Sequence, residues 1–133
     1  MLHHLSLAVS DLHRSAAFYD SALGALGYVR SWIHEISNGY KEAAIGNGPA
    51  GRDDVFAIRL RAHGVVAPSE GFHVAFSAPS REAIAAFRRA APENRGIDNG
   101  GCGLHPEHGP DYFAAFVIDP DGYRIEAVLP KEA

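Results

Sequence analysis

The chain has 133 residues, 47% of them hydrophobic, and a formal net charge of −4 at pH 7. That length and apolar content suffice for one compact domain with a core, and the basic residues are too scattered to give an electrostatic footprint for nucleic acid. The single cysteine, Cys102, excludes an internal disulfide, and no apolar stretch approaches the roughly 20 residues that a membrane span needs. We therefore expect a cytoplasmic domain that binds neither nucleic acid nor a membrane.

The first predicted unit is a strand followed by a helix. Residues 3–9 alternate with the period of a half-buried strand. Its two faces carry Leu5, Leu7 and Val9 on one side and His4, Ser6 and Ala8 on the other. Ser10 and Asp11 then supply N-cap chemistry, and apolar residues recur at helical spacing until Gly27.

Three further strands complete a first module with the order βαβββ. They are predicted over residues 28–36, 40–46 and 54–61. The dipeptide Asn38-Gly39 indicates a tight hairpin between the first two of these strands. The segment 62–71 contains glycine and proline and is interpreted as a linker.

The second half of the chain repeats this order. Strands are predicted over residues 72–78, 95–99, 111–118 and 123–129, with a helix from Pro79-Ser80 to near Pro92 after the first of them. The glycine-rich segment 96–103 predicts a flexible hairpin or lid, because no helix follows it that could hold a phosphate. The tetrapeptide at residues 119–122, Asp-Pro-Asp-Gly, suits a type I turn.

A single shift of 69 residues relates the two halves. It superposes His4 on His73 (73 − 4 = 69), Phe18 on Phe87 and Gly27 on Gly96. A repeat of this length that occurs twice indicates a duplicated module rather than an open array. We therefore expect one α+β domain in which module one, about residues 1–62, and module two, about residues 71–133, are related by a pseudo-twofold axis.

Three residues of the repeat are candidate metal ligands. His4 and His73 occupy equivalent positions, and Glu126 lies where the shift places Ala57 in module one. All three ligand candidates are predicted on the face opposite the apolar one, and two imidazoles with one carboxylate suit Zn²⁺, Ni²⁺, Mn²⁺, Fe²⁺ or Co²⁺. The competing interpretation is that both histidines are ordinary strand residues and that Glu126 is a solvated carboxylate. The pseudo-symmetric placement favours the metal site.

Five further residues are candidates for lining a substrate pocket. Ser6 shares the strand face of His4, and Ala57 occupies the position in module one that is equivalent to Glu126. His105, His108 and Tyr112 lie in one loop, which could border a pocket and shuttle protons. The alternative for this loop is a solvated connection.

Three segments of the chain carry a family resemblance: residues 4–19, 71–76 and 116–126. They resemble the vicinal oxygen chelate superfamily, which includes glyoxalase I, type I extradiol dioxygenases, fosfomycin-resistance thiol transferases and bleomycin-resistance proteins. The resemblance implies that paired βαβββ modules form a cup-shaped mixed sheet with the helices outside. It also implies a divalent metal in the cup at His4, His73 and Glu126, and a homodimer of two such chains.

By the same resemblance, the metal acts as a Lewis acid on two adjacent oxygens of a small-molecule substrate, and Glu126 is both ligand and catalytic proton shuttle. The sequence departs from each family member in some respect, which reduces the number of candidate reactions only in part. Ala57 replaces the fourth protein ligand of glyoxalase I. Extradiol dioxygenases usually have four modules, whereas this chain has two, and bleomycin-binding proteins lack the metal ligands. We expect a glyoxalase-like lyase or isomerase. The alternatives are a ring-cleaving dioxygenase, a thiol transferase of the fosfomycin-resistance type, and a non-catalytic protein that binds an antibiotic.

Overall fold

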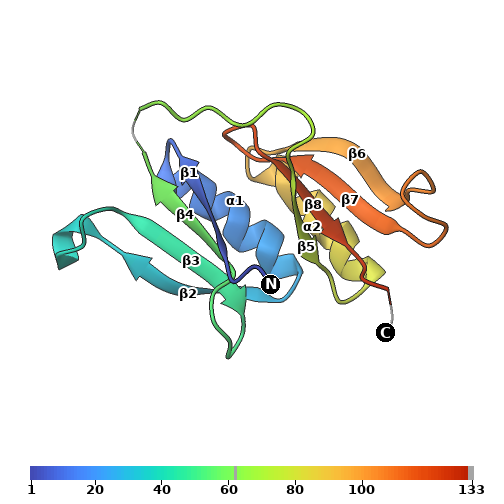
Figure 1. Cartoon of the computed structure of the whole chain (residues 1–133), viewed down its shortest axis with the longest axis horizontal. Helices are drawn as coiled ribbons and strands as arrows, with labels where there is room; N and C mark the ends of the chain where they lie inside the picture. The colour runs from blue at the N-terminus through green and yellow to red at the C-terminus, as the bar shows by residue number, and fades with distance from the viewer. Residues whose placement is uncertain (62, 132–133) are drawn as a thin grey trace.

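The structure is a computed structural model that describes residues 1–61 and 63–131. Residue 62, where module one was predicted to end, and residues 132–133, where module two was predicted to end, lie outside the described residues. Figure 1 shows two similar units side by side, each with one helix against a sheet. In chain order the elements are β1 (Leu5–Val9), α1 (Leu12–Ala25), β2 (Tyr28–His34), the 3-10 turn η1 (Ile36–Asn38), β3 (Ala44–Pro49), β4 (Phe56–Leu60), β5 (Val74–Ser77), α2 (Arg81–Glu93), β6 (Ile97–Leu104), β7 (Phe113–Ile118) and β8 (Arg124–Val128). The prediction of two βαβββ modules is confirmed.

Each module forms its own four-stranded mixed sheet. The strand orders are β1-β4-β3-β2 and β5-β8-β7-β6, and β1 with β4 and β5 with β8 are the parallel pairs. Ser6 lies opposite Ala57 in the first sheet, and Ala75 lies opposite Glu126 in the second. The shift of 69 residues therefore holds for individual strand partners, which confirms that Ala57 and Glu126 are equivalent positions.

The two helices begin where the sequence supplies capping residues. The Asp11 side chain accepts a hydrogen bond from the backbone nitrogen of Arg14 (3.0 Å), and Ser80 accepts one from Ala83 (3.1 Å). These bonds satisfy donors that the first turn of a helix leaves unpaired. The helices pack against each other, and each covers one face of its own sheet. Within the described ranges, no helix is both long and apolar enough to cross a membrane.

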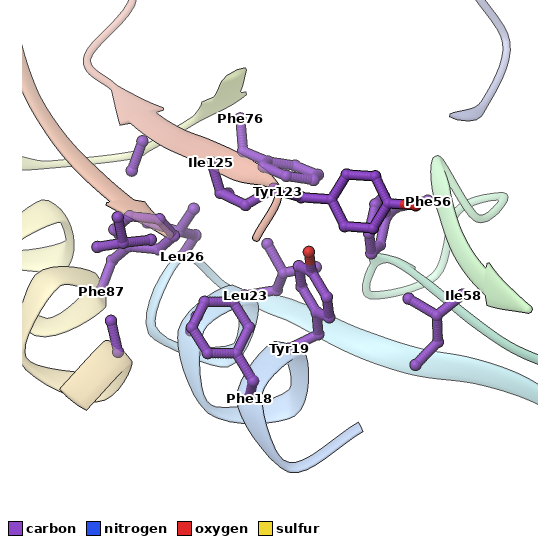
Figure 2. Packing of buried hydrophobic residues seen from close by; sticks show 14 of the residues in the cluster. Phe18, Tyr19, Leu23, Leu26, Phe56, Ile58, Phe76, Phe87, Tyr123 and Ile125 are labelled. Atoms are coloured by element: carbon purple, nitrogen blue, oxygen red, sulfur yellow. The ribbon is translucent and has the colours of Figure 1, made fainter. Parts of the chain in front are cut away.

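One hydrophobic core joins the two modules, as Figure 2 shows. The repeat-related residues Phe18 and Phe87 are both fully buried. Phe56 of β4 lies 5.3 Å from Phe76 of β5, ring centroid to ring centroid, so the aromatic contact crosses the module boundary. Edge-to-face pairs at such distances add to the stabilisation that burial alone provides.

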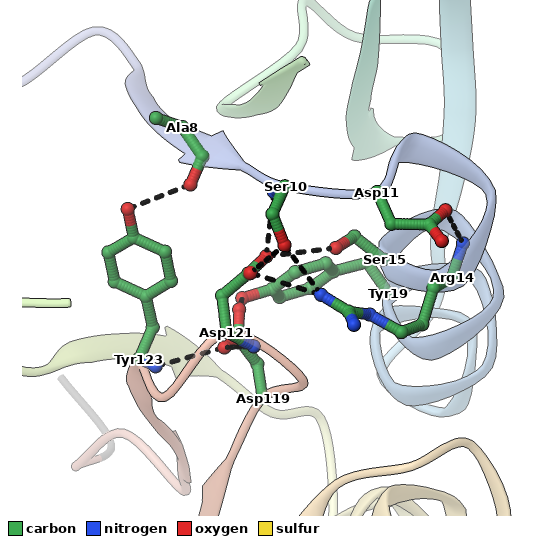
Figure 3. Close-up of polar contacts among 9 residues, drawn as sticks. All are labelled: Ala8, Ser10, Asp11, Arg14, Ser15, Tyr19, Asp119, Asp121 and Tyr123. Atoms are coloured by element: carbon green, nitrogen blue, oxygen red, sulfur yellow. Dashed lines mark hydrogen bonds and ion pairs between the residues drawn. The ribbon is translucent and has the colours of Figure 1, made fainter. Parts of the chain in front are cut away.

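A carboxylate in the turn before β8 also connects the modules, as Figure 3 shows. Asp121 accepts hydrogen bonds from the backbone nitrogen of Ser10 (3.2 Å) and from its hydroxyl, and it pairs with Arg14 at 3.0 Å. The hydrogen bond from Gly122 N to Asp119 O (3.0 Å) closes this turn, so a turn at residues 119–122 is confirmed. Because Ser10 and Arg14 belong to module one, these contacts fix the orientation of one module against the other.

The predicted tight hairpin at Asn38-Gly39 is wrong. Pairing between β2 and β3 begins with His34 opposite Ala44, so the connection spans residues 35–43. Gly39 has φ +89° and ends the 3-10 turn instead of forming half of a two-residue loop. Left-handed backbone favours glycine in either setting, so the dipeptide alone could not distinguish the two.

The segment predicted as a flexible hairpin or lid, residues 96–103, is not a lid but part of an antiparallel strand pair. Residues 97–104 form β6, which pairs with β7 along its length. The pairing is irregular between Asp98 and Gly101, where Gly100 has φ +129° and Gly101 has φ +78°. The glycines therefore permit a bulge within a strand.

Candidate metal centre

Glu126 is a charged residue buried on the face of the second sheet that no helix covers. Its strand neighbours Ile125 and Ala127 belong to the hydrophobic core, so Glu126 points to the opposite face. It lies opposite Ala75 of β5 and Phe116 of β7, and these side chains share its face. Only 1% of its surface is exposed. This burial contradicts the interpretation of Glu126 as a solvated carboxylate.

Two side chains contact the two oxygens of Glu126. Nε2 of His73, which directly precedes β5 and is 49% exposed, lies 3.1 Å from Oε1. The hydroxyl of Tyr112 donates a hydrogen bond to Oε2. Burial, together with the hydrogen bond and charge of Glu126, raises the pKa of Tyr112 to about 12. The phenol therefore stays protonated and remains a donor at neutral pH.

The loop of residues 105–112 brings two imidazoles to the same face. It connects β6 to β7 and is closed by a hydrogen bond from His105 N to Tyr112 O (2.7 Å). The His105 ring lies edge-on to Phe116 at 4.9 Å, and the His108 ring lies 5.2 Å from that of Tyr112. Since Phe116 is the strand partner of the buried carboxylate, the three pocket candidates of this loop gather beside it.

One nitrogen of His105 has no hydrogen-bond partner among the described residues. The His105 side chain is 13% exposed, and its Nδ1 lies 3.1 Å from the Glu107 carboxylate. Its Nε2 is buried without a hydrogen-bond partner in the part of the chain that the structure describes. An unsatisfied buried polar atom carries a free-energy penalty, which a ligand group could remove.

His4 does not join His73 and Glu126 within the chain. It directly precedes β1, in the other sheet, and it is exposed, with its Nδ1 2.9 Å from Nδ1 of His3. Among residues 1–61 and 63–131, no three His, Cys, Asp or Glu side chains are grouped closely enough to hold a metal ion. The structure thus brings together two of the three predicted ligands.

Trp32 lies over Gly46, the strand partner of the position in module one that corresponds to the carboxylate. The row of strand partners Trp32, Gly46, Ala57 and Ser6 in the first sheet corresponds to Gly101, Phe116, Glu126 and Ala75 in the second. A Cβ added to Gly46 would lie 2.2 Å from atoms of the Trp32 indole, so the ring lies directly on this strand. Ala57, the next residue in this row, is buried, whereas Ser6 is exposed.

The sequence alone allowed Trp32 to lie at a dimer contact, in the pocket lining or in the core, and it did not identify Phe116 as part of the site. The signal for Trp32 was Gly46, because a glycine inside a strand often marks the close approach of another group. The signal for Phe116 was the turn at residues 119–122, which joins β7 to β8. Regular antiparallel pairing back from this turn places Phe116 opposite Glu126.

A family profile identifies the superfamily of this chain. The profile of the Glyoxalase/Bleomycin resistance protein/Dioxygenase superfamily matches residues 1–127. The chain belongs to this superfamily. The match covers module one and most of module two, which agrees with the resemblance seen in the sequence motifs.

The chain is also similar to individual members of this superfamily, among them a named enzyme and proteins of solved structure. A lactoylglutathione lyase from Salmonella typhimurium is 33% identical over 132 residues, which cover 99% of this chain and 94% of that protein. A glyoxalase/bleomycin resistance protein from Albidiferax ferrireducens T118 superposes with a TM-score of 0.74 at 26% identity, covering 96% of this chain and 97% of that one. Glyoxalase I from Zea mays gives a TM-score of 0.71 at 27% identity, covering 96% of this chain but 45% of the maize chain. The predicted α+β fold of paired modules is confirmed.

Proposed function

We propose that this protein is a metal-dependent, glyoxalase-like enzyme of the lyase or isomerase type. The observation that carries the proposal is Glu126, a carboxylate with 1% exposure whose Oε1 lies 3.1 Å from the accessible imidazole of His73. Burial of a carboxylate beside an imidazole gives little net stability, because desolvation offsets the attraction between them. Such an arrangement on an open sheet face is expected where function requires it.

The donor set fits a divalent metal. Neutral imidazole and carboxylate together suit Zn²⁺, Ni²⁺, Mn²⁺, Fe²⁺ or Co²⁺, and Glu126 and His73 are already adjacent. His4 would be the third ligand. A metal held by these residues would supply Lewis-acid stabilisation of charge on two adjacent substrate oxygens.

His4 completes this set when a second chain supplies it. It belongs to the first sheet, and the first and second sheets are separate within one chain. We propose that a homodimer places module one of one chain against module two of the other, which forms the cup that the family resemblance implies. Each dimer then has two sites, and each site has ligands from both chains.

The side chains near Glu126 have distinct proposed roles. His4 and His73 act as neutral ligands, and Glu126 accepts a proton from substrate carbon and returns it to the neighbouring carbon. His105 offers the unpaired Nε2 as a hydrogen-bond partner for substrate. Ser6 lines the facing surface of module one, and Trp32, which lies over Gly46, lines it in place of the buried Ala57.

The similar lyases suggest a substrate class. Lactoylglutathione, which appears in the name of the Salmonella protein, carries a hydroxyl and a carbonyl oxygen on adjacent carbons. This matches chelation through two oxygens. Isomerisation of the corresponding thiohemiacetal to the thioester moves one proton between the adjacent carbons and one between their oxygens, and it needs no oxidant. One carboxylate can perform the transfer between the carbons.

The test is thioester formation from glutathione and methylglyoxal, followed by absorbance, with protein loaded with each candidate metal in turn. We expect activity that a chelator removes, and a decrease in kcat/KM of about 100-fold or more for Glu126→Gln. The control is Glu82→Gln, which changes an exposed carboxylate in the first turn of α2. Metal-dependent oxygen uptake with a catechol, conjugation of fosfomycin to a thiol, or tight ligand binding indifferent to chelator would instead support the dioxygenase, thiol transferase or binding protein.

A further inference from the structure

The two oxygens of the Glu126 carboxylate have different surroundings. Oε1 lies 3.1 Å from Nε2 of His73, the other proposed ligand in this module. Oε2 accepts a hydrogen bond from the hydroxyl of Tyr112. One oxygen is therefore associated with the proposed metal ligands, and the other is held by a group that cannot bind the metal in its protonated form.

Tyr112 is held firmly by its own backbone. Its carbonyl accepts a hydrogen bond from His105 N (2.7 Å), and its nitrogen donates to Gly109 O (3.3 Å). Residue 113, the next in the chain, begins β7, so the sheet fixes the chain immediately after Tyr112. Its ring also contacts that of His108, at 5.2 Å between centroids. The phenol therefore approaches Glu126 from a fixed position.

We infer that Tyr112 is a positioning residue, which holds Oε2 of Glu126 so that Oε1 remains the metal-binding oxygen. The inference rests on the proposed metal site, and it adds that the hydrogen bond from Tyr112 sets the orientation of the carboxylate. Partners that orient a ligand in this way typically change metal affinity by 10- to 100-fold when they are removed. The Tyr112 hydroxyl touches neither substrate nor metal in this account.

The test measures Co²⁺ binding to Tyr112→Phe by titration and by the visible absorption of the bound ion. We expect Co²⁺ to bind about 10- to 100-fold more weakly than to the wild type. The absorption spectrum should also change, because Glu126 can then rotate and bind through both oxygens. The matched control is Tyr123→Phe, which removes another phenol hydrogen bond, to the carbonyl of Ala8 (2.8 Å), that joins the two modules away from Glu126.

The outcomes separate this inference from the proposed function. If Tyr112→Phe binds Co²⁺ with wild-type affinity and spectrum, the positioning role is overturned and the metal site stands. If the wild-type protein binds no Co²⁺, the proposed function itself fails. Thermal unfolding of both variants without metal provides the remaining readout. A general structural defect in Tyr112→Phe would lower its unfolding midpoint more than Tyr123→Phe lowers its own. If Tyr112→Phe binds Co²⁺ more weakly and also shows this larger loss of thermal stability, the positioning role is rejected.

Discussion

Asp119 and Glu126 are both almost fully buried carboxylates, with 3% and 1% exposure, and their partners differ in kind. Asp119 accepts hydrogen bonds from the hydroxyl of Tyr19 (2.5 Å) and from the backbone nitrogens of Asp121 and Tyr123 (both 2.9 Å), as Figure 3 shows in part. The fold itself thus supplies every partner, which indicates a structural role. One partner of Glu126 is instead an imidazole open to solvent, where a ligand could enter.

Replacement of Tyr19 by Phe tests the role of Asp119. The change removes a hydrogen bond to a buried charge and should lower the free energy of unfolding at pH 7 by about 1.5–3 kcal/mol. Burial raises the pKa of Asp119 above its ordinary value of 3.8, and the Tyr19 hydrogen bond opposes that rise. The pKa of Asp119 in the variant should therefore be higher still. Chemical denaturation at several pH values measures the effect.

The sign of the pH dependence follows from the raised pKa. A carboxyl whose folded pKa is raised contributes most stability when protonated, below 3.8, and this contribution is lost as the pH rises through the folded pKa. The deficit of Tyr19→Phe should therefore shrink as the pH falls toward 3.8. Tyr40→Phe, which alters an exposed tyrosine, should change stability by less than about 0.5 kcal/mol at every pH. A deficit for Tyr19→Phe that is independent of pH would show that Asp119 is not the group involved.

At the scale of elements, the sequence predicted the order of strands and helices because alternation, capping residues and the repeat all agree. The sequence repeat did not, however, predict that Gly27 and Gly96 have different structural roles. Gly27 has φ +92° after α1, whereas the left-handed position after α2 is occupied by Arg95, with φ +66°. A Cβ on Gly96 would lie 2.5 Å from the Phe18 ring, so that glycine permits close packing instead. One repeated residue type thus serves two physical needs.

Arg95→Gly should therefore stabilise the protein. Left-handed backbone is unfavourable for residues with a Cβ, and its relief outweighs the extra entropy of glycine in the unfolded chain. We expect the free energy of unfolding to increase by about 0.5–1 kcal/mol, measured by denaturant titration. Arg89→Gly, a change within α2, should be destabilising by about 1 kcal/mol. A loss of stability in Arg95→Gly would mean that its side chain makes a contribution larger than the backbone strain.

Some residues of the candidate site could be predicted from the sequence, and others could not. His73 and Glu126 were identified because a duplicated strand pattern places them on one face, and the structure brings them into contact. The contact with Tyr112 could not be derived, because it depends on how the loop of residues 105–112 folds back onto the sheet. Trp32 illustrates the same limit, since its place over Gly46 depends on the register between β2 and β3.

For the whole molecule, the two modules are joined by a shared core and by Asp121, yet their sheets remain separate. One chain therefore presents two parts of the proposed site: His73 and Glu126 on the second sheet, and His4 at the start of the first. This separation is the physical reason for proposing that two chains complete each metal centre.

The most direct test is the metal content of chains that lack one histidine. Wild-type protein, His4→Ala, His73→Ala and an isolated heterodimer of the two variants would be loaded with Zn²⁺, desalted and analysed for bound metal. We predict one metal per chain in the wild type, almost none in either variant alone, and one metal per heterodimer, because only one of its two sites then has His4, His73 and Glu126 together. A wild-type protein without bound metal, or variants that retain it fully, would contradict the account.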